Sequence, residues 1–174
     1  MIDIKENFLP KNIFKQLHDK LFSEIFSWYL AHDVVSYDAK WSATCEDIYN
    51  WQLIHNFYES PATFSQEINI MNSVMKIIDP RLLIRIKANL TPRADKIVEH
   101  GFHRDIEPPI PNSTTAILYL NTNNGYTVFE DGSKVDSVAN TFVSFPSDMK
   151  HTGSTCTDTK FRGLINFNYI KGNV

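Results

Sequence analysis

One short segment of the chain carries side chains that could hold a metal ion. It reads His100-Gly-Phe-His103-Arg-Asp105. In an extended chain, residues two apart project from the same face, so His103 and Asp105 can offer an imidazole nitrogen and a carboxylate oxygen to one point. His100 is a competing ligand, but residues three apart diverge on an extended chain. We therefore expect His100 to lie in a loop near the mouth of the site.

A third ligand must come from elsewhere in the chain, and His151 is the candidate. It stands at the exit of the turn Phe145-Pro-Ser-Asp-Met-Lys150, several expected strands after Asp105. Two imidazoles and one carboxylate on one face of an octahedron leave the other positions open, which is the arrangement that suits non-haem Fe(II). The sequence thus predicts a metal site made of His103, Asp105 and His151.

The last apolar run of the chain also carries a cation and two amides. From Arg162 onward the residues alternate, which places Arg162, Asn166 and Asn168 on one face of a strand. A buried guanidinium is costly unless it is paired, and an anionic ligand would remove that cost. Since guanidinium matches a carboxylate bidentately, Arg162 is the natural receptor for the remote carboxylate of a dicarboxylic co-substrate. Lys160 has the same parity, so alternation alone does not decide between the two cations.

His103-x-Asp105, His151 and Arg162 resemble the iron ligands and the co-substrate arginine of the Fe(II)/2-oxoglutarate-dependent oxygenases. The chain is most similar to the prolyl 4-hydroxylase branch, over about half its length. The runs that carry this likeness are Thr115-Ala-Ile-Leu-Tyr-Leu-Asn121, Asn124-Gly-Tyr-Thr-Val-Phe129, Asn140-Thr-Phe-Val-Ser-Phe-Pro146 and Arg162-Gly-Leu-Ile-Asn-Phe-Asn-Tyr169. In the family the basic residue usually follows the distal histidine by nine or ten positions. Here Arg162 follows His151 by eleven positions and Lys160 follows it by nine. We favour Arg162 because the strand that it begins better resembles the family's strand.

The resemblance implies a cofactor, a co-substrate and roles for further residues. Fe(II) would be held by the three ligands, and 2-oxoglutarate would chelate it while its 5-carboxylate binds Arg162. Ascorbate is a candidate reductant. By the same likeness Tyr119 would contact the 5-carboxylate, although an interior aromatic without a ligand is an equally simple interpretation. Asn89, one strand before His103, would supply a polar contact to the co-substrate.

The implied reaction is hydroxylation of an aliphatic C–H bond, coupled to conversion of 2-oxoglutarate and dioxygen into succinate and carbon dioxide. The substrate would be a peptidyl proline, or an amino acid or small metabolite, because specificity is set by loops. Residues 91–102 and 106–112 are the expected substrate-facing stretches. The alternatives are a non-catalytic cupin-like module that binds a metal or ligand, and a jelly-roll interaction protein without metal.

The rest of the sequence predicts the elements that must position these residues. Apolar residues at helical spacing indicate helices over 13–29 and 62–78. Short runs rich in β-branched and aromatic residues then predict strands, with an Asp131-Gly132 hairpin turn between two of them. The expected strands are residues 82–90, 114–121, 126–130, 133–138, 141–145 and 160–169.

This order of elements predicts an α+β fold, with an antiparallel sheet curled into a sandwich or barrel. With the resemblance, it becomes a double-stranded β-helix (jelly roll, cupin-like) with N-terminal supporting helices. We expect one domain over 1–174, in which about 1–80 is mostly helical support and about 81–170 is the jelly-roll core.

Length, charge and cysteine content exclude several classes of protein. A chain of 174 residues can bury a core without metal or disulfides, so a metal would serve function. A net charge of −3 gives no footprint for nucleic acid or anionic membranes, and the nucleic-acid-demethylating branch has a second arginine where this chain has Asn168. Cys45 and Cys156 form no metal or redox motif. The sequence has neither the pattern of a signal peptide nor an apolar stretch long enough for a transmembrane helix, so we expect a cytoplasmic protein.

Overall fold

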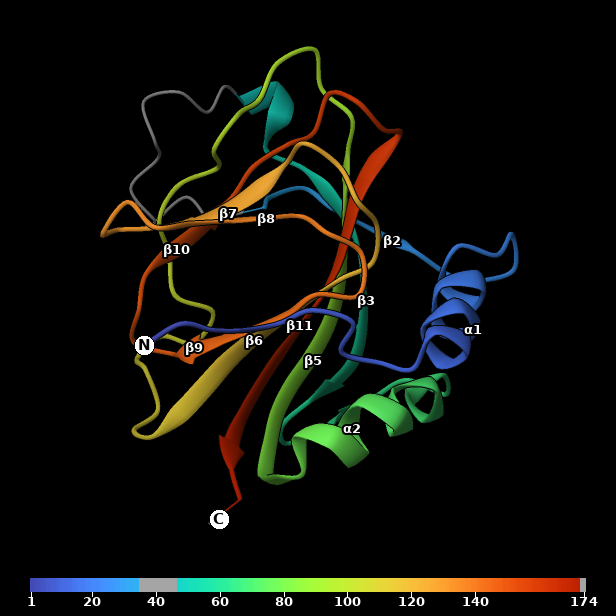
Figure 1. Ribbon diagram of the computed structural model, residues 1–174, viewed down its shortest axis with the longest axis vertical. Helices are drawn as coiled ribbons and strands as arrows, with labels where there is room; N and C mark the ends of the chain where they lie inside the picture. The colour runs from blue at the N-terminus through green and yellow to red at the C-terminus, as the bar shows by residue number, and fades with distance from the viewer. Residues whose placement is uncertain (35–46, 173–174) are drawn as a thin grey trace.

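Two antiparallel β-sheets face each other across the interior of the protein (Figure 1). The computed structural model describes residues 1–34 and 47–172, so Cys45 lies outside the described residues. The larger sheet has the order β1 (Asp3–Lys5), β9 (Phe142–Pro146), β6 (Ser113–Tyr119), β11 (Phe161–Lys171), β5 (Pro80–Pro92), β3 (Gln52–Glu59) and β2 (Tyr29–Ala31), with β4 (Thr63–Phe64) paired to β3. The smaller sheet has the order β10 (His151–Gly153), β7 (Tyr126–Phe129) and β8 (Lys134–Asp136).

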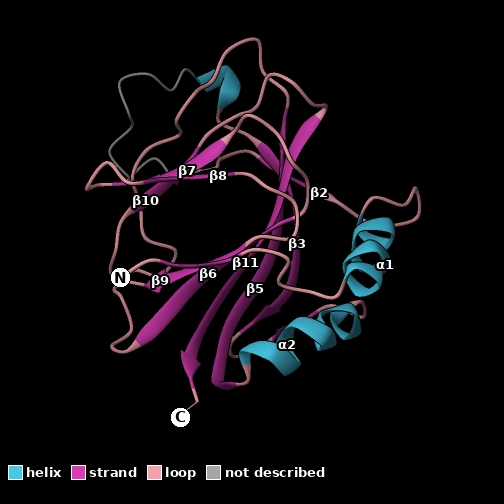
Figure 2. Cartoon of the chain, in the orientation of Figure 1, coloured by secondary structure: helices cyan, strands magenta, loops and turns pink. Residues whose placement is uncertain are grey.

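Two helices cover the outer face of the larger sheet on one side of the molecule (Figure 2). They are α1 (Lys11–Leu21) and α2 (Asn72–Ile78), and α2 follows a short 3-10 helix over Ile68–Met71. A second 3-10 helix spans Asp47–Tyr49. In the part of the chain that the structure describes, no helix has the length and apolar character needed to span a membrane.

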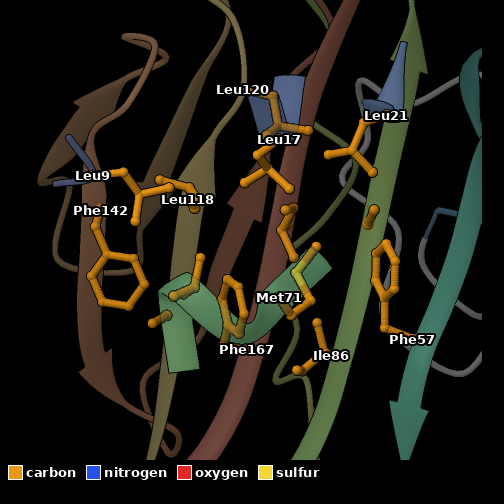
Figure 3. Close-up of a cluster of buried hydrophobic side chains, with 14 of the residues drawn as sticks. Leu9, Leu17, Leu21, Phe57, Met71, Ile86, Leu118, Leu120, Phe142 and Phe167 are labelled. Carbon is orange, nitrogen blue, oxygen red and sulfur yellow. The ribbon is translucent and has the colours of Figure 1, made fainter. Parts of the chain in front are cut away.

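The main hydrophobic core lies between these helices and the outer face of the larger sheet (Figure 3). Alternate residues of β6, β11 and β5 point into this core, because successive side chains of a strand face opposite sides of the sheet. Ile165 and Phe167 of β11 are fully buried there and meet Leu17 and Leu21 of α1 and Met71 ahead of α2. Burial of this apolar surface is what holds the helices on the sheet.

The opposite face of the same strands looks into the space between the two sheets. Ile117, Tyr119 and Leu164 form a second, smaller apolar cluster there with residues of the smaller sheet, including Phe129 and Val135. The remaining inward positions of β5 and β11, such as Asn89, Arg162 and Asn166, are polar. The predicted alternation of β11 is therefore confirmed, with the apolar set on the helices and the polar set inside.

The sequence prediction for the first 80 residues was wrong in part. The first helix ends at Leu21 and does not continue to Tyr29. Ser23 Oγ donates to the carbonyl of Lys20 and Trp28 Nε1 donates to that of Leu21. These side chains satisfy carbonyls at the end of the helix, and the chain then turns into β2.

The second predicted helix, over 62–78, also begins too early. Phe64 lies in β4 and packs against Tyr58 across the hairpin to β3, with ring centroids 4.9 Å apart. Only α2 and the preceding 3-10 helix follow the helical spacing, and the predicted stop before Pro80 is confirmed. Strands β1 to β4 mean that residues 1–80 are not mostly helical, because part of this segment extends the larger sheet.

The strands predicted from residue 82 onward are confirmed, with small shifts at their ends. Asp131-Gly132 forms the predicted turn between β7 and β8, with Gly132 in the left-handed region at φ 85°. The Asp131 carboxylate accepts hydrogen bonds from the backbone and hydroxyl of Ser133. Strand β10, which starts at His151, was not predicted because it is only three residues long.

The main core gives a direct test of this architecture. We expect Phe167→Ala to lower the free energy of unfolding by about 3–5 kcal/mol, because it leaves a cavity among fully buried side chains. Leu82→Ala, at a position that is 52% exposed, should cost less than about 1 kcal/mol. Chemical denaturation of both variants measures the difference, and equal losses would contradict the assignment of Phe167 to the core.

Candidate metal centre and the adjoining cavity

The structure brings His103, Asp105 and His151 together at the open edge between the sheets. The backbones of His103 and His151 exchange two hydrogen bonds of 3.0 Å, as in an antiparallel bridge. The two imidazoles are therefore cross-strand neighbours, with ring centroids 4.9 Å apart. Asp105 follows two residues later, and one ligand atom from each of the three side chains lies within 4.8 Å of the others. The spacing argument for these residues is thus supported by their placement.

The two histidines are held in a form that can bind a cation. His103 Nδ1 lies 3.0 Å from the carbonyl oxygen of Gly101. When Nδ1 carries the proton and donates to this carbonyl, Nε2 keeps its lone pair, and Nε2 is the atom that faces Asp105 Oδ1 at 3.9 Å. His151 is buried against Phe145, and burial lowers its pKa to about 4. Its imidazole is neutral at neutral pH, as a metal ligand must be.

The third side chain, Asp105, is oriented by two neighbours on the larger sheet. Arg85 Nη2 of β5 lies 3.1 Å from Oδ1, and Asn168 Nδ2 of β11 donates to Oδ2 at 3.2 Å. Asn168 also donates to Thr115 Oγ1, and its own oxygen accepts from Arg85 Nε at 3.0 Å. Burial alone would raise the pKa of Asp105, but these groups and the two imidazoles hold it well below its usual range. The carboxylate is therefore charged and fixed toward the histidines.

Two imidazole nitrogens and one carboxylate oxygen are a donor set that fits a divalent transition metal, and Fe(II) in particular when other positions stay open. The hydrogen bonds to His103 and Asp105 are the kind of outer contact that orients metal ligands. The residues present therefore fit the metal that the sequence resemblance implies.

Arg162 of β11 lies in the same interior and is buried, with 2% of its surface exposed. Its Nε donates to Ser137 Oγ at 2.7 Å and its Nη2 to Thr127 Oγ1 at 3.0 Å. The Tyr119 hydroxyl donates to the same Thr127 oxygen, and the Tyr119 ring lies 5.5 Å from the guanidinium carbon. All of these partners are neutral. Among the described residues no carboxylate lies within ion-pair distance of Arg162. The buried guanidinium could therefore bind the carboxylate of a ligand, which would offset the cost of its burial.

Two glycines make room for this arginine. A Cβ at Gly125 would lie 2.7 Å from Arg162 Cδ, and one at Gly153 would lie 3.1 Å from Nη1. Both distances are shorter than ordinary contacts between a Cβ and its neighbours. The guanidinium is therefore packed directly against the backbone of the smaller sheet.

A cavity connects the metal ligands to Arg162. The residues that line it come from both sheets and include Lys87, Asn89, Thr91, His100, Thr127, Arg162, Leu164 and Asn166, besides the three metal-ligand candidates. Asn89 is where the sequence placed it, and its buried Oδ1 makes no hydrogen bond within the described chain. Lys160 is exposed and precedes β11. Of the two cations between which the sequence left the choice open, Arg162 is therefore the one that faces the interior. Tyr119 lies behind Thr127 and contacts Arg162.

The expectation for His100 holds in part. His100 lies in a loop, as expected, but it is buried and lines the cavity, with only 2% of its surface accessible. Burial, together with the nearby charge of Arg162, lowers its pKa to about 4. It does not belong to the group of ligand atoms formed by His103, Asp105 and His151.

Three inward residues were missed by the sequence reasoning. Arg85 and Lys87 have the same parity on β5 as Asn89, so the alternation argument used for Arg162 would have found them. Thr127 carried no signal in the sequence, because a threonine in a strand is most often ordinary packing.

Comparison with known proteins supports the fold. No family model matches the sequence, and no curated protein sequence matches it either. The structure is similar to a prolyl hydroxylase from Trichoplax adhaerens, solved in complex with an oxygen degradation domain peptide fragment of hypoxia inducible factor. That match has a TM-score of 0.64 and 14% sequence identity, and covers 98% of this chain and 83% of the other.

Two further solved structures show the same likeness. A Pseudomonas putida prolyl-4-hydroxylase matches with a TM-score of 0.55 at 13% identity, over 98% of this chain and 93% of the other. The epimerase SnoN, in complex with Fe3+, alpha ketoglutarate and nogalamycin RO, matches with a TM-score of 0.64 at 9% identity, over 98% and 78%. The fold is therefore the jelly roll of the 2-oxoglutarate and Fe(II) oxygenases, a double-stranded β-helix.

The buried histidines predict how stability depends on pH. An ordinary histidine in the unfolded chain titrates near 6.5, whereas His100 and His151 titrate at about 4 in the folded protein. Between these values the unfolded state binds more protons, so stability falls as the pH falls. The metal-free protein should lose up to about 1.4 kcal/mol per pH unit for each histidine in this window.

Urea denaturation of chelator-treated protein at several pH values between 4 and 7 measures this slope. His100→Gln should remove its share of the dependence, and a stability that stays flat in both proteins would contradict the burial of neutral imidazoles.

Proposed function

We propose that the chain is a single-domain Fe(II)- and 2-oxoglutarate-dependent dioxygenase that hydroxylates an aliphatic C–H bond. One observation carries the proposal. The ligand atoms of His103, Asp105 and His151 lie within 4.8 Å of one another, and the same cavity contains Arg162, a buried cation that has no anionic partner among the described residues. A metal and a carboxylate-bearing co-substrate would together satisfy both features.

In this proposal His103, Asp105 and His151 would hold Fe(II), and a donor set of two imidazoles and one carboxylate would leave positions open for the co-substrate and dioxygen. When bound, the iron activates dioxygen with 2-oxoglutarate as the source of electrons, and the substrate C–H bond is oxidised. Arg162 binds the 5-carboxylate, because a guanidinium in a water-poor cavity gives a strong, oriented contact with a carboxylate.

The surrounding residues hold these groups in place. Thr127 accepts from both Tyr119 and Arg162, and so fixes the direction in which the guanidinium points. Tyr119 therefore positions Arg162 in addition to any contact with the co-substrate, and Asn89 offers an amide to it. The apolar cluster that includes Ile117 and Leu164 keeps the cavity poor in water, which strengthens its electrostatic contacts.

A groove of about 610 Å³ lies near the chain segments that carry Asp105 and His151, although none of the three metal-ligand candidates lines it. One wall is the segment after Asp105, which includes Pro109 and Pro111, and the other is the turn before His151. Arg104 Nε links the two by donating to the carbonyl of Asp148 at 2.8 Å. A peptidyl proline is one candidate substrate, and an amino acid or small metabolite is the second candidate because the cavity at the metal ligands is small.

A non-catalytic cupin-like module that only binds a metal or ligand is the alternative function. It would share the ligand set and Arg162, but would show no oxidation. Consumption of 2-oxoglutarate in air, with or without ascorbate as reductant, separates the two.

Anaerobic titration tests the proposed chelate. We expect a weak visible charge-transfer band when Fe(II) and 2-oxoglutarate are both added to the protein, and 2-oxoglutarate turnover after air is admitted. Asp105→Ala should lose the band and most of the metal affinity but stay folded, because the core does not depend on a metal. An unchanged spectrum together with no turnover would reject the oxygenase.

Arg162→Met should weaken 2-oxoglutarate binding by roughly a hundredfold, because it removes a buried charge-assisted contact worth about 3 kcal/mol. Iron binding should change little. Lys160→Met is the matched control and should leave both affinities within about twofold, since Lys160 is exposed. Calorimetry of Mn(II) binding to the metal-free protein, and of 2-oxoglutarate binding to the Mn(II)-loaded protein, measures the two affinities. The reverse pattern would transfer the role to Lys160.

A further inference from the structure

A second cation, Lys87, faces the interior from β5. In the register of the larger sheet, Lys87 lies opposite Asn56 of β3 on one side and Asn166 of β11 on the other. Lys87 and Asn166 both line the cavity. The three side chains form one row across the inner face, which we call the Lys87 row.

Lys87 has no ion pair or hydrogen bond with any described residue. Two acidic residues lie near Lys87, and neither pairs with it. Asp105 forms an ion pair with Arg85 and accepts a hydrogen bond from Asn168, and Glu59 is exposed to solvent. The amides of Asn56 and Asn166 flank Lys87, and their buried oxygens make no hydrogen bond in the described chain. A carboxylate would be bound by the Lys87 ammonium and by the amide NH2 groups, because amide oxygens only accept. Burial lowers the pKa of Lys87, and the charge of Arg85 adds to this effect. Lys87 is partly buried, and a partly desolvated charge without a partner costs some stability, which a bound anion would offset.

The Lys87 row lies at the opposite end of the cavity from Arg162. Asn166 and Arg162 are four residues apart on β11, which is roughly 13 Å along a strand. The next row along the sheet is formed by Arg85 and Asn168, whose side chains hold Asp105. Lys87 is therefore beside the metal ligands, and Arg162 is remote from them.

We propose that Lys87, flanked by Asn56 and Asn166, is a second carboxylate-binding subsite at the metal end of the cavity. The inference deepens the proposed function and rests on it. Charge complementarity favours it, because Arg85, Lys87 and Arg162 face the interior, whereas Asp105 is the one acidic residue among the described residues that line the cavity. A bound divalent metal would add more positive charge.

Two ligand carboxylates could occupy the subsite. One is the 1-carboxylate of 2-oxoglutarate, which lies next to the keto group that chelates the metal. The other is a carboxylate on the primary substrate, in which case the substrate class is a free amino acid or other small acid and not an internal residue of a peptide.

The test compares Lys87→Met with the exposed control Lys160→Met. Binding of 2-oxoglutarate and of 4-oxopentanoate, which has a methyl group in place of the 1-carboxylate, is measured by calorimetry on Mn(II)-loaded protein. If the subsite takes the 1-carboxylate, Lys87→Met weakens 2-oxoglutarate binding by roughly tenfold or more and leaves 4-oxopentanoate unchanged. If it takes the substrate, both affinities are unchanged, and the variant loses stimulation of 2-oxoglutarate turnover by free amino acids but not by their amides.

Melting temperature gives an independent readout. Lys87→Met should melt at the same or a higher temperature than the wild type, because methionine fills the site without a buried charge. Equal weakening of both compounds, or unchanged binding together with an unchanged response to amino acids, would overturn the subsite. The proposed function fails separately, if the wild type itself binds neither Mn(II) nor 2-oxoglutarate.

Discussion

Strand β11 is buried on both faces, and the two faces have opposite chemistry. Ile165 and Phe167 pack under the helices, while Arg162 and Asn166 look into the space between the sheets. The side-chain period of a strand is two, so a shift of register by one residue would exchange these sets. The apolar core thus fixes the register that places the guanidinium inside, and site and stability depend on the same alternation.

The interior that results is rich in positive charge. Within residues 1–34 and 47–172, the Arg162 guanidinium donates to the hydroxyl groups of Ser137 and Thr127, and Arg85 forms an ion pair with Asp105. These charges are held by neighbours that would otherwise be ordinary packing residues, such as Ser137 and Thr127. Groups that are already oriented need little reorganisation when a ligand arrives, which is how a fixed polar site gains affinity for an anion.

Much of this site could be predicted from the sequence, because it depends on local periodicity. His103 and Asp105 are two residues apart and the Arg162 strand alternates cleanly, so their faces followed from spacing. What spacing cannot give is the partner across the sheet. Arg85 meets Asp105, and Thr127 links Tyr119 to Arg162, only because distant strands pair in a particular register.

The errors in the first 80 residues have the same origin. Tyr29 and Phe64 continue a helical spacing in the sequence, but tertiary contacts decide their state, since both residues pair with β3. His100 looked like a loop residue, which it is, yet the loop folds inward. Whether an irregular segment is buried depends on which other parts of the chain cover it, and this cannot be predicted from the sequence of the segment alone.

Part of the wall around Arg162 is backbone, at Gly125 and Gly153. A Cβ at Gly125 would lie 2.7 Å from Arg162 Cδ and 2.7 Å from the carbonyl oxygen of Thr155, so an added methyl group there would require the arginine or the backbone to shift. At Gly153, where the Cβ would lie 3.1 Å from Nη1, a displacement of a few tenths of an ångström would be enough. The position of the guanidinium thus depends on the absence of two side chains as well as on its hydrogen bonds to Ser137 and Thr127.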